Sequence, residues 1–332
     1  MKKKWISVLA VIVMGTLLFT ACKKQEEAAP ASKGEQADDA SARNELDRAQ
    51  NDIETVYNSD QYAGNQRGSA VNLLCGSVTL NTNNFTITYN GVNCGSRIIG
   101  GSIDVTLLSG TKFSDVNAKL KIVFNNYKIH YNSSGEEIVY NGTTYITNST
   151  GGTLASLFTT TPGTVVHKTR GALTLTYDTT GTGGSTFQRT WNLFRKKTFT
   201  SNGAQTGISL KFEGDTIVNG YLPGTYDAVS EYGLDVENRK FIHTIPTPFV
   251  WSNCGTTYSG PYVLKTGRVE HTAFSDNNLY KYQFTATAGY RNDGTNNILD
   301  QSCSSSGYLI NWSAYVLPNT TPFVKYSVYQ SY

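Results

Sequence analysis

Two carboxylates on a predicted strand are the first residues in this sequence that could carry out catalysis. Glu213 and Asp215 flank a single glycine, and because side chains alternate along a strand, both would lie on one face of a sheet. Retaining glycosidases hold two carboxyl groups about 5 to 5.5 Å apart, one as nucleophile and one as acid. The pattern needs a further carboxylate on that face, whereas residues 216–218 read Thr-Ile-Val. Because this carboxylate is missing, glycan hydrolysis is only an alternative function, with carboxylates drawn from Glu213, Asp215, Asp227 and Glu231.

Three short motifs of serine acyl-transfer enzymes also occur in the chain. They are Ser-x-x-Lys at 109–112, Lys-Thr-Gly at 265–267 and Ser-Asp-Asn at 275–277. In penicillin-recognising enzymes Ser-x-x-Lys opens a buried helix, but here it follows a predicted strand, and Lys-Thr-Gly precedes Ser-Asp-Asn. Such tripeptides occur by chance in a chain rich in Ser, Thr, Gly, Lys and Asn, so they predict no catalytic residue.

The histidines give no sign of a nucleophile pair or a metal site. His130, His167, His243 and His271 lie far apart in the sequence, each on a predicted strand or at its end. No Cys-x-x-Cys pair supports a zinc site. We therefore predict no metal and no cofactor, and we interpret the histidines as hydrogen-bonding residues of strand surfaces.

One aromatic cluster is a candidate ligand groove. Phe187, Arg189 and Trp191 alternate along a predicted strand and share one face. An arginine between two aromatic residues is unusual in a core unless its guanidinium stacks on their rings. The cluster predicts either a groove for a ligand or partner, or an edge of the core at which the arginine head reaches solvent.

The first thirty residues have the pattern of a lipoprotein signal peptide. Lysines at 2–4 precede an apolar run at 5–19, and a small-residue step ends at Cys22. We predict a signal peptide at 1–21 and a lipid on Cys22 that anchors the chain in the bilayer of the outer membrane. The body would be exposed at the cell surface or would face the periplasm. An ordinary secretory signal is the alternative; a retained span is disfavoured because a span needs about 20 apolar residues.

The remaining cysteines predict two disulfide bonds. Four cysteines allow three pairings, and export to an oxidising compartment favours disulfides. Cys75 and Cys94 flank one short hairpin, while Cys254 and Cys303 bracket the hairpin around 265–288. We therefore predict that Cys75 pairs with Cys94 and Cys254 with Cys303, each closing a loop worth about 3 to 4 kcal/mol.

The net charge gives no support to nucleic-acid binding. The formal charge of the whole chain is +3, and the three lysines at 2–4 supply all of it. Once the signal peptide is removed the chain is neutral and has no basic run. We therefore predict no nucleic-acid partner.

The elements that must position these residues are mostly strands. From about residue 68 the apolar pattern has a period of two, as in Leu120-Lys121-Ile122 and Leu173-Thr174-Leu175. Asn-Gly pairs at 90–91, 141–142 and 202–203 predict hairpin turns. The pattern is typical of an all-β antiparallel fold: a sandwich or curved sheet, with an open or partial barrel as the alternative.

Before the strands we expect a tether and one helix. Residues 22–40 lack aromatic residues and predict a flexible tether. Within 41–58 the residues Ala42, Leu46, Ala49, Ile53 and Val56 recur at helical spacing, which predicts an amphipathic α-helix docked on the body, or otherwise a solvated extension of the tether. The body at 68–332 is predicted to be one domain, with a split near 165 or 220 as the alternative.

Several segments resemble one family. The segment from Phe85 to Cys94, followed by Arg97 and Gly101-Ser102-Ile103, is similar to the ITIDFGxGC stretch of a group of uncharacterised surface lipoproteins of Bacteroidota. Residues 23–27, just after Cys22, are similar to the charged segment that follows the lipidated cysteine in such proteins. The segments at 189–191, at 247–254 and around Cys303 also resemble theirs, although aspartates near Cys303 are missing here. The resemblance implies a compact β fold with these cysteines and brings no known activity.

Function is the least constrained prediction. The anchor and the lack of a convergent catalytic set favour a non-catalytic binding or envelope-associated module, whose ligand would be a glycan, a peptide or a protein. A glycan hydrolase and a purely structural envelope protein are the alternatives.

Overall fold

The computed structural model describes residues 33–57, 73, 75–81, 84–158, 161–178, 186–201, 203, 207–235, 238–254, 262–275 and 277–331. The side chains at 33–41, 92 and 324 are excluded from this description. The predicted signal peptide, Cys22 and the first part of the predicted tether lie outside the described residues.

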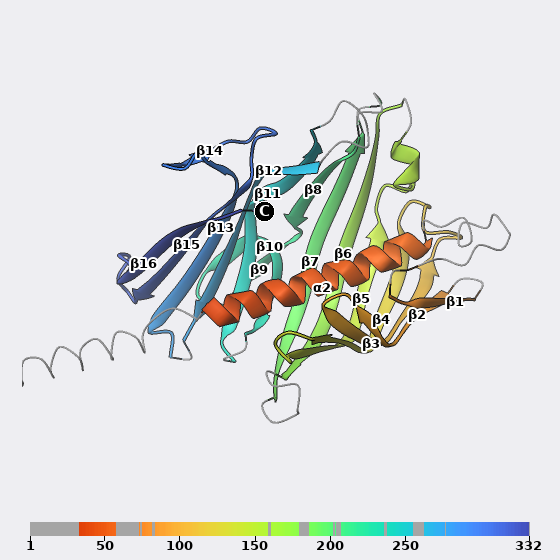
Figure 1. Cartoon of the computed structure of the whole chain (residues 1–332), viewed down its shortest axis with the longest axis horizontal. Coiled ribbons are helices and arrows are strands. Elements are labelled where there is room, and N and C mark those ends of the chain that lie inside the picture. Colours follow the sequence, from red (N-terminus) through yellow and green to blue (C-terminus); the bar gives the residue numbers. More distant parts are fainter. Residues whose placement is uncertain are drawn as a thin grey trace, which may run out of the picture.

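Within the described residues all the strands belong to one antiparallel sheet, and helix α2 lies on its inner face (Figure 1). The elements are α2 (Lys33–Tyr57), β1 (Ser77–Asn81), β2 (Asn84–Cys94), β3 (Arg97–Ser109), β4 (Ala118–Tyr131), β5 (Glu137–Asn148), the short 3-10 helix η1 (Ala155–Leu157), β6 (Gly163–Asp178), β7 (Thr186–Ser201), β8 (Ser209–Gly214), β9 (Thr216–Asn219), β10 (Thr225–Leu234), β11 (Lys240–Asn253), β12 (Tyr262–Phe274), β13 (Tyr280–Asn292), β14 (Asn297–Leu299), β15 (Gly307–Val316) and β16 (Val324–Ser331). The predicted all-β fold with one helix is confirmed.

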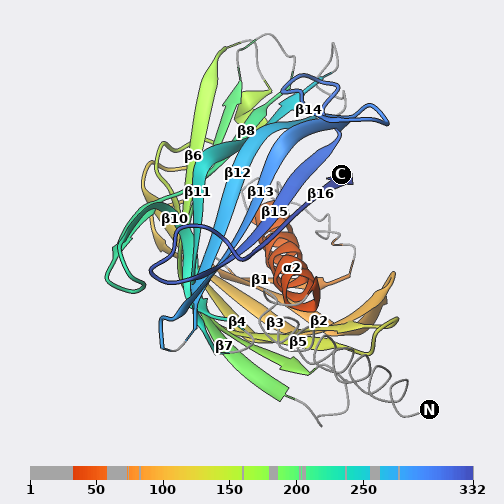
Figure 2. The same cartoon turned by 90° about the vertical axis from the view of Figure 1, so that its left-hand side faces the viewer.

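The sheet is open and strongly curved. Its strands follow the order β1-β2-β3-β4-β5-β6-β7-β10-β11-β12-β13-β15-β16, with β8 beside β7 and β11, β9 beside β10, and β14 beside β13. Figure 2 shows the sheet curling around α2. We call the face that carries α2 the concave face and the opposite one the convex face.

Glycines at close backbone approaches allow this curvature. Gly101 in β3 has φ +84°, and a Cβ there would lie 2.0 Å from the carbonyl oxygen of Asn126 in β4. Gly142 in β5 has φ +130°, and a Cβ would lie 2.5 Å from the carbonyl oxygen of Ala172 in β6. Glycines and bulges at such points bend a sheet. The predicted turns at 90–91 and 141–142 are therefore wrong: the first pair lies inside β2, at a bulge, and the second inside β5, at the bend.

Helix α2 begins earlier than predicted. It starts at Lys33, inside the segment predicted to be a tether. Five of the eight residues at 33–40 are good helix formers, and they extend the docked helix toward its N-terminus in spite of one glycine and two aspartates. The five residues predicted to share its buried face, Ala42, Leu46, Ala49, Ile53 and Val56, are all buried in the main core. That part of the prediction is confirmed.

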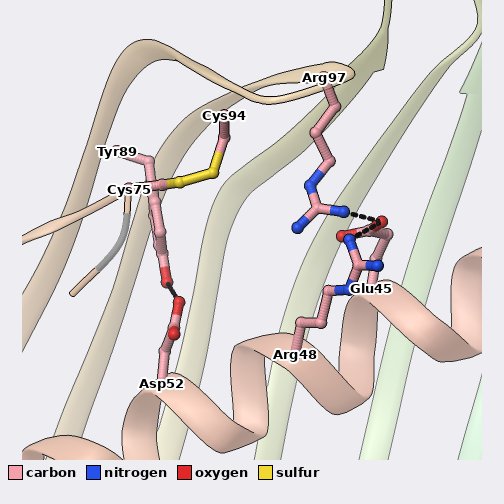
Figure 3. The surroundings of a disulfide bond; sticks show 7 residues. All are labelled: Glu45, Arg48, Asp52, Cys75, Tyr89, Cys94 and Arg97. Atoms are coloured by element: carbon pink, nitrogen blue, oxygen red, sulfur yellow. Dashed lines mark hydrogen bonds and ion pairs between the residues drawn. A yellow bond between two sulfur atoms is a disulfide. The ribbon is translucent and has the colours of Figure 1, made fainter.

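Both predicted disulfides are present. Cys75 pairs with Cys94 and so ties the chain just before β1 to the end of β2 (Figure 3). Cys254 pairs with Cys303, which joins the residue after β11 to the segment between β14 and β15. Each bond therefore fixes one region near an end of the strand order.

Candidate functional site

One row of residues crosses the concave face from beneath α2 to an edge of the sheet. Each member is the register partner of the next: Leu193, Glu231, His243, His271, Phe284, Trp312 and Tyr326. The exposed fraction is 0% at Leu193, 2% at Glu231 and 61% at Tyr326. Along this row the concave face therefore changes from a half that α2 covers to a half that α2 leaves uncovered.

A buried polar cluster lies in the covered half. The carboxylate of Glu231 accepts from Nη2 of Arg195 at 2.8 Å and lies 2.5 Å from Nε of Arg43 on α2. Nδ1 of His243 lies 2.7 Å from the same carboxylate, and Nη1 of Arg195 also reaches Asp47 on α2 at 3.0 Å. Two cations and two carboxylates from helix and sheet thus meet in one place.

Neighbouring charges set the protonation of this cluster. Burial alone would raise the pKa of Glu231, but Arg43, Arg195 and the hydrogen bond from His243 outweigh it and hold that pKa well below its ordinary value. Burial, with the positive charges of its neighbours second, lowers the pKa of His271 well below its ordinary value. Glu231 is therefore ionised and His271 neutral near pH 7.

The two histidines are linked to each other as well. Nε2 of His243 is in hydrogen-bond contact with Nδ1 of His271. An ionised carboxylate can only accept, so Nδ1 of His243 carries a hydrogen toward Glu231. The polar atoms of Glu231 and His243 are thus engaged by each other and by their neighbours, which suits a structural network better than an acid or base awaiting a substrate.

Two further polar contacts fix α2 on the first strands (Figure 3). Oε1 of Glu45 accepts from Nη1 of Arg97 at 3.0 Å and from Nη1 of Arg48 at 3.2 Å, and the hydroxyl of Tyr89 donates to Asp52 at 2.7 Å. Burial raises the pKa of Glu45 and of Asp52. Arg97 and Tyr89 come from β3 and β2, and the Glu231 cluster from β7, β10 and β11, so strands on both sides of α2 hold its central part.

The uncovered half of the concave face is apolar and partly exposed. Phe284 packs against Trp312 with ring centroids 5.6 Å apart, and Ile310 and Val328 form the neighbouring register pair. Tyr326 and Val328 on β16 are 61% and 46% exposed. We call Tyr282, Phe284, Ile310, Trp312, Tyr326 and Val328 the uncovered face. None of the six carries a charge itself; at the border with the covered half the guanidinium carbon of Arg239 lies 4.9 Å from the ring centroid of Tyr282, which packs against the main core. The other five can hold an apolar group against the sheet.

The predicted aromatic cluster does not line a groove. Arg189 and Trp191 are 1% and 0% exposed in the covered half. The guanidinium carbon of Arg189 lies 4.3 Å from the ring centroid of Tyr177 and 4.7 Å from that of Trp191, while Phe187 stacks on Tyr177 at 4.8 Å. Arg189 therefore stacks on Trp191 as expected, but its second ring is Tyr177 and not Phe187. Arg189 and Trp191 are buried, so the groove prediction is wrong for these two residues, while Phe187 is half-buried against the core.

The carboxylates proposed for hydrolysis are divided between the two faces of the sheet. Glu213 forms ion pairs with Lys196 at 3.2 Å and Lys211 at 2.8 Å on the convex face, and Asp215 pairs with Lys168 and Arg170. Asp227 is exposed and accepts a hydrogen bond from the next backbone amide. Glu231 lies on the concave face, so it cannot act together with Glu213 and Asp215, whose carboxylates are each held by two cations.

Ser109 and Lys112 of the Ser-x-x-Lys motif have ordinary local roles. The hydroxyl of Ser109 donates to the carbonyl of Asn117 at 3.2 Å, and Asp115 accepts from the backbone amide of Lys112.

The sequence did not predict that Glu231, His243 and His271 lie together, because their contact depends on strand register. Within the described ranges no group of three or more His, Cys, Asp or Glu residues is suited to hold a metal ion.

Comparisons with known proteins add no assignment. No family model, no curated protein and no solved structure matches this chain. In the part of the chain that the structure describes, no helix is both long and apolar enough to cross a bilayer.

Proposed function

We propose that this protein is an exported, lipid-anchored binding module without catalysis, and that its uncovered face binds the hydrocarbon part of a lipid-like ligand. One observation carries the proposal. Along a single row of register partners the same concave face changes from fully buried residues beneath α2 to half-exposed aromatic residues beside it. An exposed apolar patch of this kind on a folded protein is typical of a binding surface.

The composition of the uncovered face favours an apolar chain over a sugar or a peptide. Its polar atoms are two tyrosine hydroxyls and one indole nitrogen, so it offers few hydrogen bonds to a hydroxylated ring or a peptide backbone. Phe284, Trp312 and Ile310 offer broad apolar contact instead. Burial of apolar area contributes roughly 25 cal/mol per Å², which makes an extended hydrocarbon chain the ligand that gains most.

The export part of the proposal rests on the sequence and the disulfides. The lysines at 2–4, the apolar run at 5–19 and Cys22 support a lipoprotein signal. The two disulfide pairs support an oxidising compartment. Placement in the outer membrane, and membership of the Bacteroidota lipoproteins that the chain resembles, belong to the same proposal.

Tryptophan fluorescence provides the test of binding. Trp312 lies on the uncovered face, whereas Trp191 lies beneath α2. A fatty acid brominated along its chain quenches indole fluorescence on contact, so we expect it to quench Trp312 in the purified protein. The quenching should fall in Trp312→Phe and should persist in Trp191→Phe.

A matched pair of charge insertions provides the control. Val328→Lys places an ammonium group on the uncovered face, and Val116→Lys makes the same change at an exposed valine before β4. Both valines are exposed, so neither change removes core packing. Binding should weaken only in Val328→Lys; equal binding by both variants, or no quenching of Trp312, would overturn the proposal.

A further inference from the structure

A second surface, independent of the uncovered face, lies on the convex side of β4 to β8. Two adjacent rows of register partners cross these strands. The first row is Lys119, Thr147, Lys168, Lys196 and Glu213. The second row is Lys121, Tyr145, Arg170 and Phe194. We call these two rows, with Lys211 and Asp215 beside them, the basic face.

Strand alternation places these side chains away from α2. Leu120, between the two β4 lysines, belongs to the core beneath α2, and His167 and Arg195 on β6 and β7 reach carboxylates of the helix. Their neighbours in the chain, including Lys168 and Lys196, therefore point to the convex side. All members of the two rows are half-buried or exposed, so they form part of the surface.

Charge is concentrated on this surface. It carries six basic side chains, Lys119, Lys121, Lys168, Arg170, Lys196 and Lys211, against the two carboxylates Glu213 and Asp215. Lys168 and Lys196 are direct register partners, an arrangement in which like charges repel. Among the described residues Lys119 and Lys121 form no ion pair, so the half of this face on β4 keeps its positive charge.

Aromatic rings and hydrogen-bonding groups lie among the charges. The ammonium of Lys119 is 4.4 Å from the ring centroid of Tyr145, and the guanidinium carbon of Arg170 is 5.9 Å from that of Phe194. Thr147 adds a hydroxyl, and Glu213 and Asp215 add acceptors. Rings, cations, hydroxyls and acceptors on one face match a ligand that carries carboxylates, hydroxyls and apolar ring faces together.

We infer that the basic face binds an acidic polysaccharide that lies across strands β4 to β8. Carboxylates of the polymer meet Lys119 and Lys121, ring faces pack on Tyr145 and Phe194, and hydroxyls donate to Glu213 and Asp215. A surface of closely spaced phosphates fits less well, because those two carboxylates would repel it. Neighbouring strands are about 4.8 Å apart, so five strands offer a track roughly 19 Å long.

The probe for the test is polygalacturonate, with its neutral methyl ester as the matched ligand. The purified protein should bind the acid polymer at low salt, bind the ester more weakly, and lose affinity as salt rises. Lys119→Gln with Lys121→Gln removes two half-buried surface charges and should weaken binding about tenfold.

The control variant changes two lysines elsewhere on the sheet. Lys281 lies 5.4 Å from the ring centroid of Tyr315, as Lys119 lies over Tyr145, and Lys325 is exposed on β16. Lys281→Gln with Lys325→Gln should leave polygalacturonate binding unchanged. Equal loss in both double variants, equal binding of acid and ester, or binding to phosphatidylglycerol vesicles without binding to the polymer would each overturn the inference. Quenching of Trp312 by the brominated fatty acid is measured separately and does not depend on this result.

Discussion

Replacement of Glu231 by glutamine should destabilise the protein strongly. The carboxylate is 2% exposed and contacts Arg43, Arg195 and His243. The amide has the same shape but no charge, so Arg195, which is 3% exposed, loses its buried counter-charge. Removal of one partner from a buried ion pair costs about 3 to 5 kcal/mol, since the remaining charge is left in a medium of low polarity.

The assay is urea unfolding at pH 7 with the disulfides intact, and a surface carboxylate serves as the control. Glu213 also pairs with two cations, Lys196 and Lys211, but on the convex face. Glu213→Gln should lower the free energy of unfolding by no more than about 1 kcal/mol. A cycle that combines Glu231→Gln with Arg195→Met should give a coupling of roughly 1 to 3 kcal/mol.

A small effect would refute this reasoning. If Glu231→Gln and Glu213→Gln lowered the free energy of unfolding equally, the cluster beneath α2 would not anchor the helix. Loss of amide protection confined to α2 in Glu231→Gln would locate the damage where the geometry puts it.

Three further predictions follow from particular groups. The pKa of His271 is lowered in the folded state, so below about pH 6.5 the unfolded chain binds a proton that the folded chain does not. The free energy of unfolding should therefore decrease as the pH is lowered below about 6.5, by up to about 1.4 kcal/mol per pH unit. Urea unfolding of His271→Phe should lack this pH dependence. The disulfides close loops of sequence separation 19 and 49, so Cys254→Ser with Cys303→Ser should cost about 0.8 kcal/mol more than Cys75→Ser with Cys94→Ser; an equal cost would contradict the chain-entropy argument. Metabolic labelling with a palmitate analogue should disappear in Cys22→Ser, and unchanged labelling would contradict lipidation of Cys22.

The period of two along the body was enough to predict an all-β fold, and helical spacing predicted the buried face of α2. The N-terminal end of α2 escaped prediction because residues 33–40 lack an apolar stripe and include Gly34, Asp38 and Asp39, which are poor helix formers. The pair at 141–142 has the composition of a hairpin turn, yet in a long strand the same glycine serves a bend. Local composition could not separate these two uses.

The site was harder to predict because it depends on which face α2 covers. Stacking of Arg189 on aromatic rings follows from strand alternation, but nothing in the strand itself shows that a helix lies above it. The contact between His243 and His271 could have been predicted from the sequence. The midpoint between them, residue 257, lies in the connection between β11 and β12, so the two residues face each other if these strands form a hairpin. Bulges between β11 and β12 shift the register, so simple alternation along the two strands does not predict this pairing.

The most direct test of the central claim is to map where an acyl chain touches the protein. A fatty acid with a photoreactive group on its chain would be bound and cross-linked to the purified protein, and the labelled peptides identified by mass spectrometry. The account predicts labels on β13, β15 and β16, at Phe284, Trp312 and Tyr326 and their neighbours. Labels spread over the convex face, or concentrated on β3 to β6, would contradict it.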